Sequence, residues 1–449
     1  MSGDGRPDWP GEADSRSEAA RLLHSVRLEP EKCVGCTTCI KKCPTEAIRV
    51  RKGRARIIDE RCIDCGECIR TCPHGAKKAV SDPLALIAGF RYKVALPAPS
   101  LYAQFDERWS IDRILSGLLA LGFDEVFEVA EAAELVTDAT LALLGPGRDG
   151  AMPRPVISSA CPAVVKLIQV RYPSLIPHLA PLLPPVEVAA RFVKERLHAG
   201  EEGVGVFFVS PCAGKVTMAR APIGYERSAL DGVIGIKDLY LPLRGVLGQA
   251  AERPLSRAGR GGIEWARTEG EADALGERRS ISVDGIQAVS GVLEALENGK
   301  LKDVAYIEAL ACPAGCVGGP LTVENPYIAR NRLRNRAESL PARSEPRDLE
   351  PLSELGWTRP PLARPALALD RDMLKAMIMM EEMDLLASSL PGLDCGSCGA
   401  PSCQALAEDV VRGQAAANDC IFKLRENVRE LAGKLLALEE QQPPGLDKD

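Results

Sequence analysis

The chain has 449 residues, of which 46% are hydrophobic, 26% charged and 4% aromatic, and its formal net charge at pH 7 is −6. This balance predicts several globular domains and argues against a basic surface for nucleic acid. No apolar run reaches the roughly 18 residues needed to cross a bilayer, and the acidic start lacks a signal-peptide core. Because the 16 cysteines fall into metal-binding patterns, we expect a reducing, cytoplasmic compartment.

The N-terminal region is predicted to contain a flexible leader (residues 1–25) and a compact α+β bacterial ferredoxin domain (26–80). The pattern C-x2-C-x2-C-x3-C-P occurs twice in that domain. In two-cluster ferredoxins the fourth cysteine of each run binds the other 4Fe-4S cluster. The paired runs disfavour zinc knuckles or disulfides. We therefore assign one cluster to Cys33, Cys36, Cys39 and Cys72, and the other to Cys43, Cys62, Cys65 and Cys68.

Residues 90–336 are predicted to form an α/β domain in which apolar strands (94–97, 204–210, 304–310) alternate with helical stretches (111–121, 186–198). Residues 251–285 are charged and glycine-rich, and we expect an insertion or mobile loop there.

Four further cysteines are spread across this domain, at Cys161, Cys212, Cys312 and Cys316. Apolar runs precede them and Pro or Gly lies beside them, as expected at the carboxyl ends of strands, where ligands gather in α/β sheets. Separate buried thiols are the alternative, since free cysteine is common in cores.

The sequences around these cysteines resemble the three signature motifs of the FeFe hydrogenases, and they read SSACPAVVK, VSPCAGK and EALACPAGCVGG. The resemblance extends over roughly residues 90–330. The resemblance implies that Cys161, Cys212, Cys312 and Cys316 hold a 4Fe-4S cube and that Cys316 bridges to a di-iron subsite, together forming an H-cluster. It also implies that Lys215 hydrogen-bonds a cyanide ligand of that subsite, for which an ammonium donor is suited.

Several positions depart from the family pattern. Ala160 stands where catalytic members carry the proton-relay cysteine, and Met218 stands where they carry the next relay acid. Ser210 and Leu310 replace methionines near the di-iron subsite. Because neither alanine nor a thioether carries a proton at neutral pH, the resemblance implies slow turnover, as in the sensory members of the family.

A proline-containing linker or strap is predicted at residues 337–369, followed by a small helical 4Fe-4S module at 370–420. Five methionines between residues 373 and 383 would either pack this module or form an adaptable partner surface. Gly396 and Gly399 would let backbone amides approach the sulfurs. A zinc site remains the alternative, because thiolate spacing does not select the metal. The module's cysteines follow the pattern C-x2-C-x4-C-x16-C and are Cys395, Cys398, Cys403 and Cys420.

Residues 421–441 are predicted to form a heptad helix, because apolar residues recur at spacings of three and four from Ile421 to Leu438. Such a helix would either form a homodimer through 421–438 or pack on its own domain.

Two functions follow. The first is a dihydrogen sensor or low-turnover hydrogenase whose partners are dihydrogen, protons, a redox protein and a separate signalling kinase or phosphatase, since the chain lacks the PAS domain common in related sensors. A slow site still senses, because binding only has to shift a population. The second is an electron-transfer or assembly scaffold with a plain 4Fe-4S cluster, because hydrogenase-like assembly proteins also lack the relay cysteine.

Overall fold

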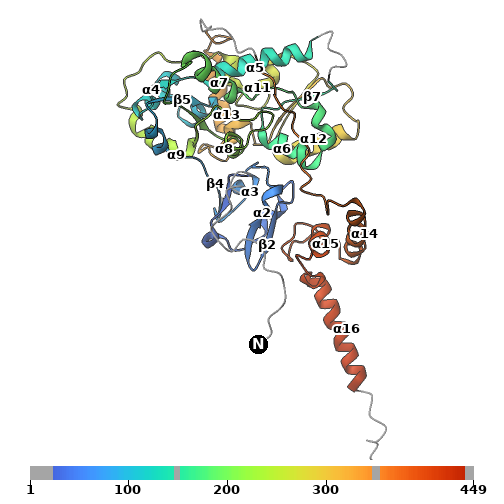
Figure 1. Ribbon diagram of the computed structural model, residues 1–449. Coiled ribbons are helices and arrows are strands. Elements are labelled where there is room, and N and C mark those ends of the chain that lie inside the picture. The colour runs from blue at the N-terminus through green and yellow to red at the C-terminus, as the bar shows by residue number, and fades with distance from the viewer. Residues whose placement is uncertain (1–23, 146–151, 346–353, 440–449) are drawn as a thin grey trace, which may run out of the picture.

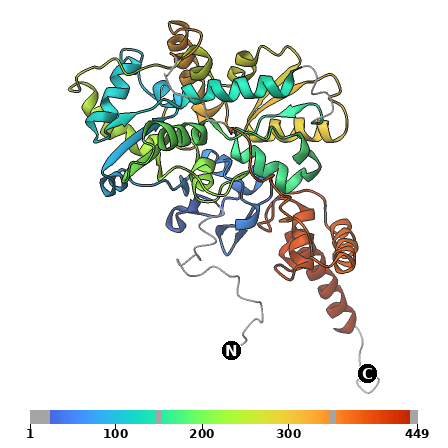
Figure 2. The ribbon, with the colours of Figure 1, turned by 45° about the horizontal axis from the view of Figure 1, so that its top comes forward.

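The structure is a computed structural model that describes residues 24–145, 152–345 and 354–439. Most of the predicted leader, residues 1–23, lies outside the described residues, whereas His24 and Ser25 are buried. Figures 1 and 2 show a large central domain with the N-terminal unit directly against it, and the terminal helices beside that unit.

The N-terminal unit consists of two antiparallel strand pairs and two short helices. β1 pairs with β4 and β2 pairs with β3. Each helix begins just before the third cysteine of a run, so both cysteine loops are held close to the strands. The elements are β1 (Val26–Leu28), α2 (Thr38–Lys41), β2 (Ile48–Arg51), β3 (Arg54–Ile57), α3 (Glu67–Arg70) and β4 (Lys77–Ala79).

The central domain contains two parallel sheets, with strand orders β6-β5-β8-β9 and β10-β11-β7. Helices cover the sheets (Figure 1), so β8 (Val204–Ser210) is an apolar run buried along nearly its whole length rather than an alternating strand. The remaining elements are β5 (Tyr92–Pro97), α4 (Ile111–Ala120), β6 (Glu125–Val126), α5 (Val129–Leu144), β7 (Val156–Ile157), α6 (Pro162–Arg171), α7 (Pro185–Phe192), α8 (Ala213–Arg220), β9 (Gly232–Gly235), α9 (Ile236–Leu247), α10 (Arg260–Glu264), α11 (Gly270–Leu275), β10 (Ser280–Asp284), α12 (Ile286–Glu297), β11 (Tyr306–Leu310) and α13 (Pro326–Glu338).

The prediction of an insertion or mobile loop at residues 251–285 is wrong. This segment forms α10, α11 and β10, and β10 pairs in parallel with β11. Ile263 and Ala272 are buried. The glycines that suggested a loop permit close packing instead: a Cβ added to Gly262 would lie 2.0 Å from the Ala130 carbonyl oxygen on α5. The segment is therefore an integral part of the central domain.

The described parts of residues 337–369 lie along the central domain. Trp357 N donates to Pro181 O at 2.9 Å, and Arg364 N donates to Gln169 O at 2.8 Å. The Arg343 guanidinium pairs with Asp138 through both of its terminal nitrogens.

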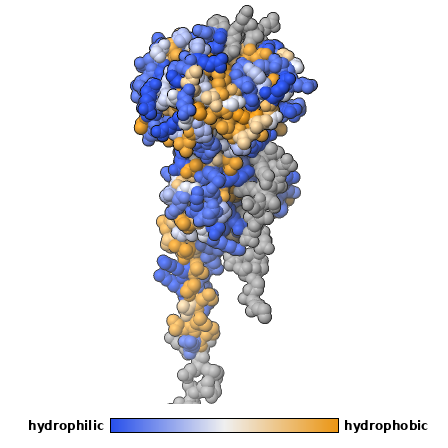
Figure 3. Space-filling view, turned by 90° about the vertical axis from the view of Figure 1, so that its left-hand side faces the viewer, coloured by the Kyte–Doolittle hydropathy of each residue, from blue (hydrophilic) through white to orange (hydrophobic). Residues whose placement is uncertain are grey.

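The terminal region consists of α14 (Met373–Ser389), α15 (Cys403–Val411) and α16 (Ile421–Glu439). On α14, Met383 and Leu386 pack against the small core around Leu406, whereas Met373 and Met377 are exposed. The long helix α16 projects away from the rest of the molecule, and apolar residues are visible along it (Figures 1 and 3). Within the described residues, no helix combines the length and apolar character needed to cross a membrane.

Candidate functional site

Four cavities are each lined by one of the four cysteine groups predicted from the sequence. The structure therefore brings together all sixteen cysteines in the expected sets, including the two in which Cys72 and Cys43 cross over. The sets are Cys33, Cys36, Cys39 and Cys72; Cys43, Cys62, Cys65 and Cys68; Cys161, Cys212, Cys312 and Cys316; and Cys395, Cys398, Cys403 and Cys420.

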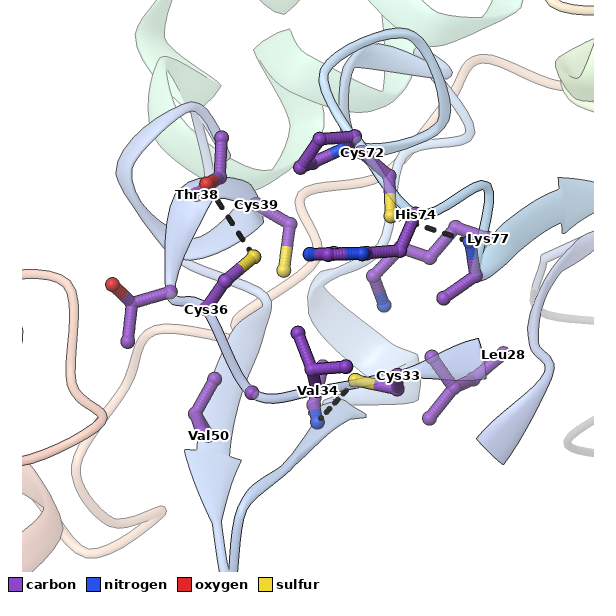
Figure 4. Close-up of a pocket in the computed structure, with 15 residues that line it drawn as sticks. Leu28, Cys33, Val34, Cys36, Thr38, Cys39, Val50, Cys72, His74 and Lys77 are labelled. Carbon is purple, nitrogen blue, oxygen red and sulfur yellow. Dashed lines mark hydrogen bonds between the residues drawn. The ribbon is translucent and has the colours of Figure 1, made fainter. Parts of the chain in front are cut away.

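The first N-terminal cavity presents donors to its sulfurs (Figure 4). Ala55 N donates to Cys33 Sγ and Ala76 N to Cys72 Sγ, both at 3.3 Å. Lys77 lines the same cavity and is buried, and its Nζ has no hydrogen-bond partner among the described residues. The exposed side chain of His74 also lies at this cavity. An anionic thiolate cluster would provide the missing partner of Lys77, so the residues fit a 4Fe-4S group.

The second N-terminal cavity is more deeply buried. Burial raises the pKa of the Cys62 and Cys65 thiols well above their usual range, and raises that of Cys68 to about 12. Thiolates must form to bind iron, so binding of a cluster here is coupled to release of protons. Ala47 N donates to Cys43 Sγ at 3.2 Å, which supplies one fixed donor for that ligand.

The central cavity lies at the carboxyl ends of parallel strands. Cys161 follows β7 and caps α6, and Cys212 follows β8 and caps α8. Both helices therefore direct the positive ends of their dipoles toward the cavity, which favours an anionic group. Cys312 and Cys316 lie on the turn after β11.

The turn that carries Cys316 is held by hydrogen bonds to Ala266 and Thr268, in the segment 251–285. Val317 N donates to Ala266 O at 3.0 Å, and Thr268 N donates to Ala314 O at 3.2 Å. Gly315 has φ of +94°, and a Cβ at this position would lie 2.7 Å from Thr268 N. Only glycine therefore fits this close approach without displacement.

The central cavity is more than twice as large as the other three. It spans about 850 Å³ of empty space, including the part open to solvent, compared with about 340, 350 and 300 Å³ for the three others measured in the same way. Its additional lining includes Ala160, Lys215, Trp265 and Glu271. The donor set and the space together fit a 4Fe-4S cube with a second, smaller group beside it.

Lys215 and Ala160 lie together at the wall of this cavity. Lys215 Nζ donates to the Ala160 carbonyl oxygen at 2.9 Å. An ammonium carries three donors, so this bond does not use its full capacity. Burial lowers the pKa of Lys215, because the charged form loses hydration, while the neighbouring cysteine sulfurs oppose this effect.

The structure also shows where the three other residues that depart from the family pattern lie, namely Met218, Ser210 and Leu310. Met218 is buried in the core of the domain, on α8. Ser210 is fully buried, and its Oγ accepts a hydrogen bond from Cys212 N at 3.0 Å. Leu310 contributes an apolar side chain to the cavity wall. Neither Ala160 nor Met218 therefore offers a side chain that carries a proton.

Sequence reasoning missed a buried pair of acids beside the cavity. Glu271 lines the cavity, and its carboxylate oxygens accept from Ser158 Oγ at 2.9 and 3.0 Å and from the Tyr306 hydroxyl. Glu308 accepts from Ala272 N at 3.1 Å and from the half-buried Ser282 Oγ at 2.9 Å.

Burial raises the pKa of both carboxyls, and the charge of Glu308 raises that of Glu271 further. Glu308 Oε1 is buried without a hydrogen-bond partner among the described residues. Glu308 lies in the EALAC sequence of the third cysteine motif, whereas Glu271 lies in the segment 251–285, whose glycines and charges predict a loop.

A direct contact joins the second N-terminal cavity to the central one. Arg70 on α3 donates to the Cys65 carbonyl at 2.8 Å and to Cys312 Sγ at 3.7 Å. Asp64, between two cluster cysteines, is buried and accepts from Lys166 Nζ at 2.8 Å and from Thr217 Oγ1 at 2.7 Å. Burial opposes ionisation of Asp64, but the charge and hydrogen bond of Lys166 prevail and lower its pKa.

The terminal module is held against the N-terminal unit by charged and backbone contacts. The buried Arg49 donates to Asp409 at 2.8 and 3.0 Å, and Arg51 pairs with the same carboxylate at 2.5 Å. Arg61 binds Glu408 through both of its terminal nitrogens. Val50 N donates to Gly399 O at 2.8 Å.

Gly399 has a role that the sequence did not indicate. Its φ is +81°, and an added Cβ would lie 1.9 Å from the Val50 carbonyl oxygen. The glycine thus permits contact between the module and β2, which lies next to the first N-terminal cavity. The four cavities consequently form a series, from the terminal module through the two N-terminal sites to the central site.

Three family models match the chain. The iron only hydrogenase large subunit, C-terminal domain, matches residues 91–246 and 256–320, a 4Fe-4S dicluster domain matches 25–73, and an Fe-S cluster family matches 390–422.

Two curated relatives are hydrogenases. The periplasmic Fe hydrogenase large subunit of Nitratidesulfovibrio vulgaris is 29% identical over 217 residues, which are 43% of this chain and 51% of the relative. Iron hydrogenase 1 of Clostridium pasteurianum is 24% identical over 291 residues, which are 52% of this chain and 50% of the relative. The chain thus spans about half the length of the curated relatives it matches.

Among solved structures, a variant of the FeFe-hydrogenase HydA1 from Chlamydomonas reinhardtii is 18% identical and covers 63% of this chain and 98% of its own, with a TM-score of 0.49. A structure of HydA(deltaEFG) is 18% identical and covers 58% and 89%, with a TM-score of 0.47. Together with the four cysteine sites, the family matches show that this iron-sulfur chain belongs to the FeFe hydrogenase large-subunit-like family, with an N-terminal ferredoxin domain and a C-terminal Fe-S module.

Proposed function

We propose that the chain reacts with dihydrogen at a slow rate and passes the electrons through 4Fe-4S clusters to a redox partner. The observation that carries this proposal is that the space beside the four central cysteines, including the part open to solvent, is more than twice the space beside each of the other three cysteine sets. When bound, a di-iron group of the family's kind would supply the reversible splitting of dihydrogen into two protons and two electrons.

The chain's own residues would hold and orient that group. Cys161, Cys212 and Cys312 would bind the cube, and Cys316 would be shared between the cube and the smaller group. Lys215 has remaining donors beside Ala160 and would hydrogen-bond an anionic ligand at this wall. Leu310 and Trp265 would exclude water from the remaining space.

Protons would leave through the buried acids rather than through the family's relay positions. Glu271 is at the cavity wall, and its neighbour Glu308 bonds the half-buried Ser282. Raised pKa values keep these carboxyls close to the point at which they both accept and release a proton near neutral pH. This route lacks a thiol next to the reacting centre, which accounts for slow turnover.

Electrons would leave through the series of cysteine sites. Arg70 connects the central site to the cluster of Cys43, Cys62, Cys65 and Cys68, and the contact between Val50 and Gly399 connects the other N-terminal cluster to the terminal module. Because that module lies farthest from the central site along the series, it would exchange electrons with the partner. A signalling kinase or phosphatase as that partner, and a reducing cytoplasmic location, remain parts of the proposal.

Isotope exchange tests the proposal at low turnover. Protein reconstituted with iron and sulfide and then matured with the di-iron cofactor would be incubated with deuterium gas in ordinary water. We expect HD and dihydrogen to accumulate, and we expect protein that received iron and sulfide alone to give none. If matured protein also gives none while its four cubes are intact, the chain is instead the electron-transfer or assembly scaffold.

A further inference from the structure

The terminal helix α16 carries one continuous apolar seam that its own module leaves uncovered. The seam residues are spaced alternately three and four apart, and their exposed fractions range from 38% to 63%. None of the nineteen described residues of α16 is buried. The seam consists of Ile421, Leu424, Val428, Leu431, Leu435 and Leu438. In the structure, α16 therefore does not pack on the chain's own domain, which was one of the two alternatives for this helix.

The composition of the seam specifies one kind of partner. Ile421, Val428 and Leu435 occupy heptad positions a, and all three d positions are leucine. Two of the three a residues, Ile421 and Val428, are β-branched, and β-branched residues at a together with leucine at d favour two parallel strands. We propose that α16 pairs with α16 of a second copy of this chain as a parallel two-stranded coiled coil.

The charges beside the seam agree with this pairing. Lys434 occupies position g and Glu439 position e of the next heptad, and both side chains are exposed. In a parallel pair, each g residue faces the following e residue of the partner. Each lysine would therefore lie opposite a glutamate of the other copy, twice per dimer by symmetry. An antiparallel pair would instead bring Glu439 near Arg425 and leave Lys434 without an acidic neighbour across the interface.

Parallel pairing has a consequence for the terminal cysteine site. Cys420 directly precedes Ile421, the first seam residue. The two copies would therefore hold their terminal sites side by side at the same end of the coil. In an antiparallel pair the two sites would be separated by the length of the helix, about 28 Å for nineteen residues. The two terminal modules of a parallel dimer would thus present adjacent sites at which electrons could be exchanged with a partner.

The seam is tested by light scattering of the full-length, anaerobically reconstituted protein over a wide range of concentrations. We expect a concentration-dependent dimer. Leu431→Asp should abolish it, whereas Leu436→Asp should not, because Leu436 is equally exposed on the same helix (61% against 59%) but occupies position b outside the seam. A monomer at every concentration, or equal loss in both variants, would overturn the proposal.

The direction of pairing is tested by exchanging charges. Lys434→Glu should weaken the dimer roughly tenfold by placing two glutamates opposite each other, and adding Glu439→Lys should restore it. Lys434 also contacts Glu430 within its own helix, and the double variant keeps that unfavourable change, so restoration isolates the contact between copies. A harmless single change and a weakened double variant would show antiparallel pairing and contradict the parallel arrangement.

Discussion

Four cysteines line the central cavity and four line the terminal cavity. The two cavities differ in volume, in the burial of their cysteines and in the side chains nearby. The central cavity spans about 850 Å³ and the terminal one about 300 Å³, in both cases including space open to solvent. Burial raises the pKa of the Cys316 thiol well above its usual range, whereas a hydrogen bond with Ser397 lowers the pKa of the exposed Cys395.

The neighbouring groups differ as well. The central site has a buried ammonium and a buried carboxyl at its wall, while the terminal site is bordered by α15, whose two acidic residues face the N-terminal unit instead. The difference fits the proposed function, in which the central site would enclose the reaction and the terminal site would exchange electrons near the surface. Changes at each site should therefore affect different measurements.

The largest expected effect is that of Glu271→Gln on turnover. The amide keeps the shape and can still hydrogen-bond Ser158, but it cannot carry a proton. We expect dihydrogen oxidation and evolution to fall by about 10²–10⁴-fold, the usual contribution of a positioned acid or base. Infrared bands of the matured cofactor should remain. Glu269→Gln, on the same segment but more than half exposed, is the matched control and should keep full turnover. Unchanged turnover in Glu271→Gln would remove this residue from the proton route.

Ala160→Cys tests the same site in the opposite direction. A thiol at the cavity wall would add the missing relay group next to the reacting centre, and we expect turnover of matured protein to rise by about 10²-fold. The pH dependence of turnover should also change, because a different group would then transfer the proton. If the rate of fully matured protein stays the same, proton transfer at position 160 does not limit it.

Asp409→Ala should release the terminal module while leaving the central site intact. The change leaves the buried Arg49 and its neighbour Arg51 without their shared carboxylate, and loss of one partner of a buried pair costs about 3–5 kcal/mol. Hydrogen exchange at the Val50 amide, which donates to Gly399, should accelerate strongly. Glu382→Ala on the exposed face of α14 should leave that amide protected. A protected amide in Asp409→Ala would mean that other contacts hold the module.

Alanine substitutions at two glycines of the terminal module separate the cost of a left-handed backbone from loss of the contact between this module and β2. Gly399 and Gly413 both have positive φ, but an added Cβ would meet the Val50 carbonyl at 1.9 Å only at Gly399, and nothing within 4 Å at Gly413. Both alanine variants should lose about 1–2 kcal/mol of module stability from the left-handed backbone. Only Gly399→Ala should also accelerate exchange at Val50. Equal exchange rates in the two variants would contradict the proposed role of Gly399.

The last expected effect concerns the pH dependence of stability. The pKa values of Glu271 and Glu308 are raised by burial, so the folded protein binds more protons than the unfolded chain at pH values above the ordinary carboxyl pKa. Their contribution to stability is therefore present in acid and is lost as pH rises through the folded pKa values, by up to about 1.4 kcal/mol per pH unit and group. Denaturant unfolding of Glu271→Gln/Glu308→Gln should show a flatter pH profile. An equally steep profile would mean that other groups cause it.

The cysteine sets were predictable from sequence because spacing and the family motifs identify them without tertiary information. Val204–Ser210 was equally clear as a strand, since a buried parallel strand is a continuous apolar run. The prediction of an insertion or mobile loop at residues 251–285 is wrong because glycines and charged residues indicate a loop only when no other part of the chain packs against that segment. Gly262 and Gly270 instead permit close backbone contacts, and Glu271 is buried.

The contacts between modules could not be predicted, because each depends on residues hundreds of positions apart. Arg49 and Asp409 give no sign of pairing in a chain in which charged residues are common. The contact between Arg70 and Cys312 likewise exists only after two domains pack together. The proposed acid route through Glu271 and Glu308 is likewise visible only in the folded domain, since it requires the pairing of β10 and β11.

The most direct test of the central claim is infrared spectroscopy of anaerobic protein, reconstituted with iron and sulfide and then given the di-iron cofactor. The Cys316→Ser variant serves as the control. We predict protein-bound carbon monoxide and cyanide bands that shift under dihydrogen in the native protein and are absent from the variant. Native protein with its full content of 4Fe-4S clusters but without bound bands would contradict the claim that the large central cavity holds a di-iron group.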